Sequence, residues 1–114
     1  MSVVVERRGF SLPLGVSPET EIFAVGDIHG RSDLLVALID EAAREPKLRD
    51  RRAIVFLGDF VDRGLDVRCT FERVLDLGAR HPVVAAVMGN HDLALVRAAR
   101  LDGGAPSAYW IDGG

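Results

Sequence analysis

Three short polar segments of the chain each begin with glycine and carry side chains that bind metals or phosphate. They are Gly26–Gly30 (GDIHG), Gly58–Gly64 (GDFVDRG) and Gly89–Asp92 (GNHD), and they follow one another at nearly equal intervals. A single segment of this kind is common in ordinary turns, because aspartate, asparagine and glycine all favour turn conformations. Three of them in register indicate a functional site.

Four side chains in these segments are candidate metal ligands: Asp27, His29, Asp59 and Asn90. Carboxylate, amide and imidazole donors suit Mn²⁺, Fe or Zn²⁺ rather than a soft, thiolate-bound metal. Asp59 lies on the central segment and is the natural carboxylate to bridge two ions. Two adjacent ions hold a phosphoryl oxygen and activate a water molecule for in-line attack. The sequence therefore predicts a two-metal site that acts on a phosphate ester.

Three further polar residues of the same segments suit the remaining steps of such a reaction. The planar guanidinium of Arg63 can hold two phosphate oxygens and stabilise developing charge. His91 is the candidate general acid that protonates the leaving alkoxide, and Asp62 can accept a hydrogen bond from its far ring nitrogen. His81 precedes a proline at the opposite end of its strand, so we expect it to be a turn residue.

Parallel strands are needed to bring the three segments together. Each segment follows a continuous apolar run, at residues 22–25, 53–57 and 83–88, as is typical of strands buried on both faces. The resulting β-α-β-α-β-α order predicts parallel neighbours joined by right-handed crossovers. The three segments then emerge at one edge of the sheet, where ligands bind in open α/β sheets.

Amphipathic patterns between and after these runs predict three helices, and residues 1–20 precede the domain. We expect an amino-terminal extension, or a short edge strand at Val3–Val5 followed by a loop, and then one domain over residues 21–114. The expected caps and bounds of the helices are Ser32 or Asp33 to Pro46, Asp66 to Gly78, and Asp92 to Arg100.

Composition narrows the class of protein. The chain has 114 residues, 48% of them hydrophobic, and a net charge of -3, which gives no electrostatic reason to expect a nucleic-acid partner. Cys69 is the only cysteine, so no disulfide framework points to an oxidising compartment. No apolar run approaches about 20 residues, the length of a membrane span. We therefore expect a cytoplasmic protein without a membrane or nucleic-acid partner.

Together the three segments resemble the signature blocks of the calcineurin-like metallophosphoesterases, and most closely the phosphoprotein phosphatase branch that includes bacterial serine/threonine protein phosphatases. The resemblance runs from about Ile22 to the end of the chain. It implies two divalent metal ions, with Mn most expected and Fe or Zn as alternatives. The roles it implies are first-metal ligands Asp27 and His29, bridging ligand Asp59, second-metal ligand Asn90, phosphate contact Arg63, and proton donor His91 paired with Asp62.

Individual residues distinguish two possible activities within this family. The phosphatase branch usually has glutamate where Asp92 stands, and Asp92 followed by Leu93 resembles the diadenosine tetraphosphate hydrolases. Val61–Gly64 resembles the protein phosphatases more, because the bacterial dinucleotide hydrolases tend to lack its aspartate. We expect a metal-dependent phosphoesterase that hydrolyses phosphate monoesters on a phosphorylated protein or a small phosphoester. The alternative is diadenosine tetraphosphate hydrolysis.

Members of this family continue into a second half that holds further histidine ligands and another arginine. This chain has three histidines, and two of them are already assigned. We therefore expect an amino-terminal part of the domain, which is the parallel half of a β-sandwich flanked by helices, with the carboxyl-terminal half missing. Half a sandwich exposes apolar sheet surface, which predicts self-association. An alternative of another class is a truncated, catalytically inactive metal-binding remnant.

Overall fold

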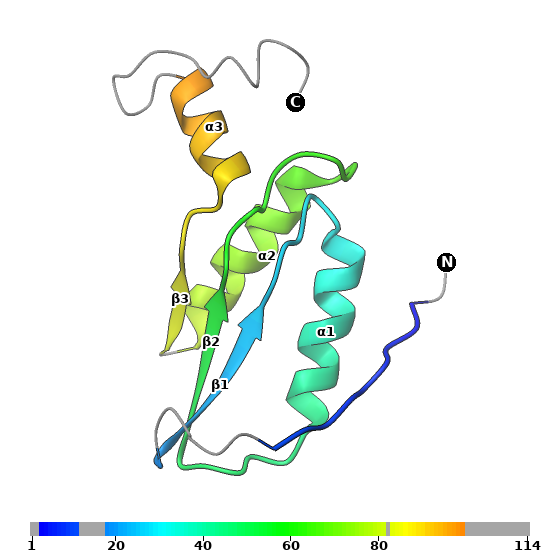
Figure 1. Cartoon of the computed structure of the whole chain (residues 1–114), viewed down its shortest axis with the longest axis vertical. Coiled ribbons are helices and arrows are strands. Elements are labelled where there is room, and N and C mark those ends of the chain that lie inside the picture. The colour runs from blue at the N-terminus through cyan, green and yellow to red at the C-terminus, as the bar shows by residue number, and fades with distance from the viewer. Residues whose placement is uncertain (1–2, 12–17, 82, 100–114) are drawn as a thin grey trace.

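A computed structural model describes residues 3–11, 18–81 and 83–99. In these ranges, strands and helices alternate strictly along the chain, which confirms the predicted order (Figure 1). The elements are β1 (Thr20–Val25), α1 (Ser32–Arg44), β2 (Arg51–Phe56), α2 (Val67–Arg80), β3 (Val84–Ala86) and α3 (Asn90–Ala98).

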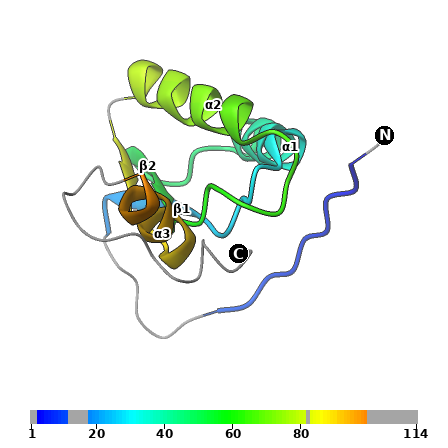
Figure 2. The same ribbon diagram turned by 90° about the horizontal axis from the view of Figure 1, so that it is seen from above.

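The strands form one parallel sheet in the order β1-β2-β3. β1 and β2 pair along their whole length, from Thr20 opposite Arg51 to Val25 opposite Phe56. Because both crossovers have the same hand, α1 and α2 lie on the same side of the sheet, as Figure 2 shows. The carboxyl ends of the strands point to one edge (Figure 1), so the predicted α/β fold is confirmed.

The hydrophobic core lies between the sheet and these two helices. Its buried strand and helix residues are Val25, Ile54, Phe56, Leu35 and Leu77. Phe60 and Val61, from the central polar segment, are buried in the same cluster. The segment that carries Asp59 and Asp62 is therefore held in place by apolar side chains that point into the core.

The opposite face of the sheet is apolar and is covered by neither α1 nor α2. Strand side chains alternate between faces, so the residues between the core positions point to this side. Ile22 is 43% exposed, Ala24 and Ala85 are exposed, and Val55 is half-buried. In the described part of the chain, this face has no covering layer of helices.

Several boundaries differ from those predicted. β1 begins at Thr20 rather than Ile22, and β2 runs from Arg51 to Phe56 rather than over residues 53–57. β3 has three residues, whereas a strand over 83–88 was expected from its apolar run. α2 continues past Gly78 and ends at Arg80. α3 begins at Asn90 rather than near Asp92, so the third polar segment supplies the first turn of a helix and not only a loop.

The predicted cap of α2 is confirmed, whereas that of α1 is wrong. The residue that precedes α1 is Arg31, which makes no side-chain cap hydrogen bond, so the predicted cap at Ser32 or Asp33 is wrong. Arg31 instead pairs with the carboxylate of Asp33 at 2.8 Å. Asp66 does cap α2, because its carboxylate accepts a hydrogen bond from the Cys69 N–H at 3.1 Å.

The amino-terminal segment, residues 3–11, contains no strand, so the edge strand considered at Val3–Val5 is not formed. This segment runs alongside α1 (Figure 1), and Arg7 pairs with the carboxylates of Glu41 and Glu45 on that helix. The Arg7 guanidinium lowers the pKa of Glu41. In the part of the chain that the structure describes, no helix has the length and apolar character needed to cross a membrane.

Candidate metal centre

Backbone hydrogen bonds join the first and the central polar segments at the carboxyl edge of the sheet. The Asp59 carbonyl accepts hydrogen bonds from the N–H groups of Ile28 at 3.1 Å and His29 at 2.9 Å. The Phe60 carbonyl accepts another from the Gly30 N–H at 2.8 Å. The position of His29 is therefore set by the backbone of the segment that carries Asp59.

Glycines permit the close approach of these segments. A Cβ added at Gly58, where φ is +99°, would lie 2.3 Å from the Gly89 nitrogen. One added at Gly89 would lie 2.1 Å from Asp59 Oδ1, and one added at Gly64 would lie 2.0 Å from the His29 carbonyl oxygen. These distances are far below van der Waals contact, so a side chain at any of these glycines would force the segments apart.

Backbone strain is concentrated in the same place. Among the described residues, the non-glycine residues with positive φ are His29 at 47°, Asp59 at 55°, Asp62 at 69° and Arg63 at 67°. A left-handed conformation costs a non-glycine residue about 1–2 kcal/mol and persists only where surrounding contacts impose it. All four residues are ones that the sequence singled out for chemistry. Strain clustered in this way is typical of functional sites.

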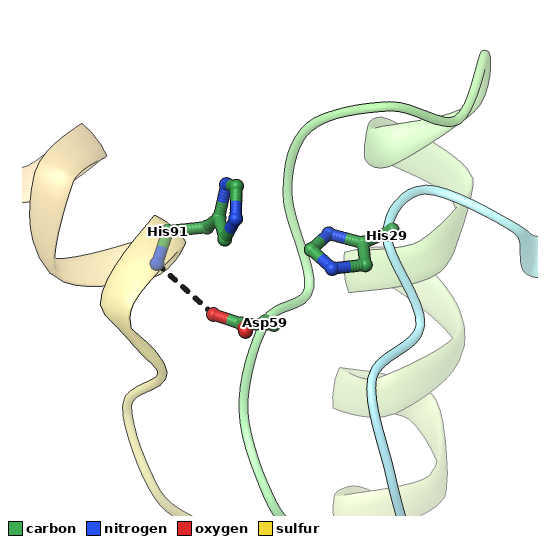
Figure 3. Close-up of side chains that lie close together, drawn as sticks. All are labelled: His29, Asp59 and His91. Atoms are coloured by element: carbon green, nitrogen blue, oxygen red, sulfur yellow. Dashed lines mark hydrogen bonds between the residues drawn. The ribbon is translucent and has the colours of Figure 1, made fainter. Parts of the chain in front are cut away.

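Three side chains converge to form a group that fits a metal ion. Potential ligand atoms of His29, Asp59 and His91 all lie within 4.8 Å of one another, and Figure 3 shows that they come from different segments. The Nδ1 of His29 donates a hydrogen bond to the Val61 carbonyl at 2.7 Å, which leaves its Nε2 for a metal. His29 and Asp59 were predicted as ligands, whereas His91 was predicted as a proton donor.

The other two predicted ligands lie at the same edge but are more exposed. Asp27 Oδ2 is 3.7 Å from His29 Nε2, the nitrogen left for coordination, and its side chain is 64% exposed. Asn90 is exposed and is the first residue of α3, next to His91. The N–H of His91 donates to Asp59 Oδ1 at 3.0 Å, which holds the start of α3 against the central segment.

The predicted pair of His91 and Asp62 is in contact. His91 Nδ1 lies 2.7 Å from Asp62 Oδ2, and both side chains are largely buried. Arg63 follows Asp62 and is exposed to solvent. His81 follows the last residue of α2 and precedes β3, so it lies at the amino end of that strand, opposite the carboxyl edge.

One residue of the site was missed by the sequence analysis, which used Asp92 only as the expected start of the last helix and to compare families. Its buried carboxylate accepts backbone hydrogen bonds from Asp59 at 2.7 Å, Phe60 at 2.8 Å, Val61 at 3.4 Å and Gly89 at 2.9 Å. The available signal was its place as the third residue of a helix that follows a glycine, where a carboxylate often caps the helix.

The family described as calcineurin-like phosphoesterase matches residues 20–112, which include every residue of this site. The chain belongs to this family. The metallophosphoesterase resemblance predicted from the three segments is thereby confirmed, and members of the family depend on metal ions.

Two classes of relative match the chain. A symmetrical bis(5′-nucleosyl)-tetraphosphatase from Dechloromonas aromatica is 40% identical over 83 residues, which are 73% of this chain and 27% of that protein. The catalytic subunit of serine/threonine-protein phosphatase 6 from Drosophila melanogaster is 38% identical over 74 residues, which are 64% and 23%. The chain thus spans about a quarter of the length of these relatives. No solved structure matches it.

Proposed function

We propose that this chain is the metal-binding part of a phosphoesterase that hydrolyses phosphate monoesters, with a phosphorylated protein or a small phosphoester as substrate. The observation that carries the proposal is that two predicted ligands, His29 and Asp59, converge within 4.8 Å with the predicted proton donor, His91. Strained backbone at His29 and Asp59 supports it, because contacts with neighbouring segments maintain a conformation that these residues would otherwise avoid.

Two divalent ions, most suitably Mn²⁺, would be held by four residues of the edge. Asp27 and His29 would bind the first ion, Asp59 would bridge, and Asn90 would bind the second. Mixed carboxylate, imidazole and amide donors suit Mn²⁺, and the hydrogen bond from His29 Nδ1 to Val61 orients its Nε2 for coordination. When bound, the ions polarise a phosphoryl oxygen and supply a nucleophilic water.

Three side chains of the chain itself then act on the substrate. Arg63 is exposed beside the site and would bind two phosphate oxygens through its planar guanidinium. His91, held through Nδ1 by Asp62 at 2.7 Å, would present its other ring nitrogen to the leaving oxygen and protonate it. Asp62 keeps the ring in this orientation.

A second candidate activity is hydrolysis of a dinucleoside polyphosphate. It is favoured by the relative from Dechloromonas aromatica, which is named as a symmetrical bis(5′-nucleosyl)-tetraphosphatase. The contact between His91 and Asp62 favours the phosphatase, because it gives the Val61–Gly64 aspartate a specific partner. Both candidates use the same ions and differ in the substrate.

A direct comparison of substrates tests the proposal. The purified chain would be incubated with Mn²⁺ and either a phosphoserine peptide or diadenosine tetraphosphate, and kcat/KM would be measured for each. We expect a higher value for the phosphopeptide. A higher value for diadenosine tetraphosphate would establish the second candidate. No turnover of either substrate by a folded, Mn²⁺-binding chain would favour the inactive remnant.

Two further properties belong to this proposal. We expect the protein to act in the cytoplasm, since its single cysteine, Cys69, gives it no disulfide to maintain in an oxidising compartment. We also expect copies of the chain to associate through the apolar face of the sheet that includes Ile22 and Val55.

A further inference from the structure

The buried carboxylate of Asp92 lies behind the candidate metal centre and both of its oxygens are already engaged. Oδ2 accepts hydrogen bonds from the N–H groups of Asp59 at 2.7 Å and Gly89 at 2.9 Å. Oδ1 accepts from Phe60 at 2.8 Å and more weakly from Val61 at 3.4 Å. A carboxylate that receives several backbone N–H groups in this way is not available as a metal ligand.

Two carboxylates hold the central segment and the start of α3 to each other. Asp92, on α3, accepts from the backbone of Asp59, while Asp59 Oδ1 accepts from the His91 N–H at 3.0 Å. The Asp59 carbonyl meanwhile accepts from Ile28 and His29. All the hydrogen-bonding groups of the Asp59 backbone are therefore used to join the three polar segments.

We infer that Asp92 is a positioning residue that holds Asp59 in its left-handed conformation, so that the Asp59 carboxylate stays directed at the proposed metal centre and against the first turn of α3. Hydrogen bonds to an ionised carboxylate are roughly twice as strong as those between neutral groups, which suits the maintenance of a strained backbone. The φ of Asp59 is 55°, and its N–H makes the shortest of the hydrogen bonds to Asp92. This inference rests on the proposed metal centre.

The geometry specifies a carboxylate and not merely a polar side chain. Asparagine has one acceptor oxygen, so in either orientation its NH₂ group would face backbone N–H groups that need an acceptor. Glutamate keeps both acceptors and is common at the third position of a helix, where it caps the amino terminus. Asp92→Asn should therefore disturb the site although it preserves shape, while Asp92→Glu should preserve the site although it changes length.

Asp66 provides a matched control at the start of α2. Its carboxylate accepts one backbone hydrogen bond, from the Cys69 N–H at 3.1 Å. Asp66 is not among the residues that donate hydrogen bonds to Asp92. Because one acceptor is enough there, and asparagine is as good a cap as aspartate, Asp66→Asn should change neither metal binding nor the backbone of the site.

The test compares the parent chain with these three variants by two measurements. Calorimetric titration with Mn²⁺ gives metal affinity, and amide hydrogen exchange of the metal-free chain reports on residues 59–61. We expect Asp92→Asn to weaken Mn²⁺ binding by about 10–100-fold, the usual effect of losing a group that supports a ligand. Exchange at residues 59–61 should become faster. Asp92→Glu and Asp66→Asn should stay close to the parent in both measurements.

Several results would overturn the inference. Unchanged exchange at residues 59–61 in Asp92→Asn would mean that Asp92 does not hold this backbone, and weaker Mn²⁺ binding would then reflect only the lost charge. If the parent binds no Mn²⁺, the proposed function fails, while the exchange comparison still decides whether Asp92 positions Asp59. If Asp92→Asn does not fold, Asp92→Glu decides: parent-like affinity and exchange support the inference, and their loss contradicts it.

Discussion

Two regions of the molecule differ in how far their side chains are buried and bonded. They are the carboxyl edge of the sheet and the sheet face opposite α1 and α2. At the edge, Asp59, His91 and Asp92 are 9%, 6% and 7% exposed, and each makes hydrogen bonds to another polar segment. On the open face, apolar side chains such as Ile22 remain 43% exposed. Contacts among the described segments therefore build the edge, whereas the open face keeps apolar side chains exposed in the described part of the chain.

This difference separates the geometry of the site from the stability of the molecule. Hydrogen bonds between segments and close glycine contacts set the positions of His29, Asp59 and His91. Burial of apolar surface supplies most of the free energy of folding, and here part of that surface stays exposed. We therefore expect substitutions at the edge to act on chemistry, and substitutions on the open face to act on association.

The largest expected effect is the loss of the proton donor at the edge. His91→Asn removes the ring that Asp62 orients, and we expect the rate of phosphate ester hydrolysis to fall by about 10²–10⁴-fold. His81→Asn is the matched control, since His81 is exposed at the opposite end of the fold and should leave the rate unchanged. Steady-state kinetics with Mn²⁺ would measure both, and equal rates for the two variants would refute the role of His91.

Next in size is an exchange of glycine for alanine. Gly64→Ala would place a Cβ 2.0 Å from the His29 carbonyl oxygen, and we expect a loss of about 1–3 kcal/mol in the free energy of unfolding, together with weaker Mn²⁺ binding. Gly78→Ala, in α2, meets nothing within 4 Å and should stabilise the chain by about 0.5–1 kcal/mol. Urea unfolding would measure the change in the free energy of unfolding for each variant, and we expect the two changes to have opposite signs. Changes of the same sign would contradict the packing described at Gly64.

A smaller effect is expected from the open face. Replacing Ile22 and Val55 together by threonine keeps β-branched side chains but removes apolar area, and we expect association to weaken by about tenfold. Leu75→Thr, at a residue 71% exposed on α2, should not change association. Sedimentation equilibrium would distinguish the two, and association that is insensitive to the double substitution would exclude this face as the interface.

The smallest expected effect concerns acid stability near the edge. The Arg31 guanidinium lowers the pKa of Asp33 from 3.8 to about 2. Since the folded-state pKa lies below the ordinary value, this pair contributes stability above about pH 4, and the contribution is lost as the pH falls toward 2. Asp33→Asn should therefore show a slightly flatter decline of stability across this range. An unchanged decline would mean that solvent screens the pair.

The fold could be predicted because continuous apolar runs and helical patterns alternate along the chain. The end of the third strand could not be predicted, because residues 83–88 are apolar throughout and contain no boundary signal. In the structure, the β3 residues paired with β2 are Val84–Ala86. The position of Arg31 immediately before α1 was also not predicted, because serine and aspartate are preferred over arginine at the cap of a helix.

The residues of the site could be predicted from their types, but their conformations could not. Glycines in the sequence indicate sharp turns. The positive φ at His29 and Asp59 could not be predicted, because it depends on contacts with segments some thirty residues away in sequence. For the same reason the hydrogen bonds from the central segment to Asp92 could not be predicted, because these partners are brought near only by the sheet.

The most direct test of the central claim is hydrolysis of p-nitrophenyl phosphate by the purified chain, with and without Mn²⁺, beside Asp59→Asn. This substitution keeps the oxygen that accepts the His91 N–H and removes the bridging charge. We predict hydrolysis that requires Mn²⁺ and is abolished by the substitution. Hydrolysis that is independent of Mn²⁺ or retained by Asp59→Asn, or none from a folded chain that binds Mn²⁺, would contradict the account.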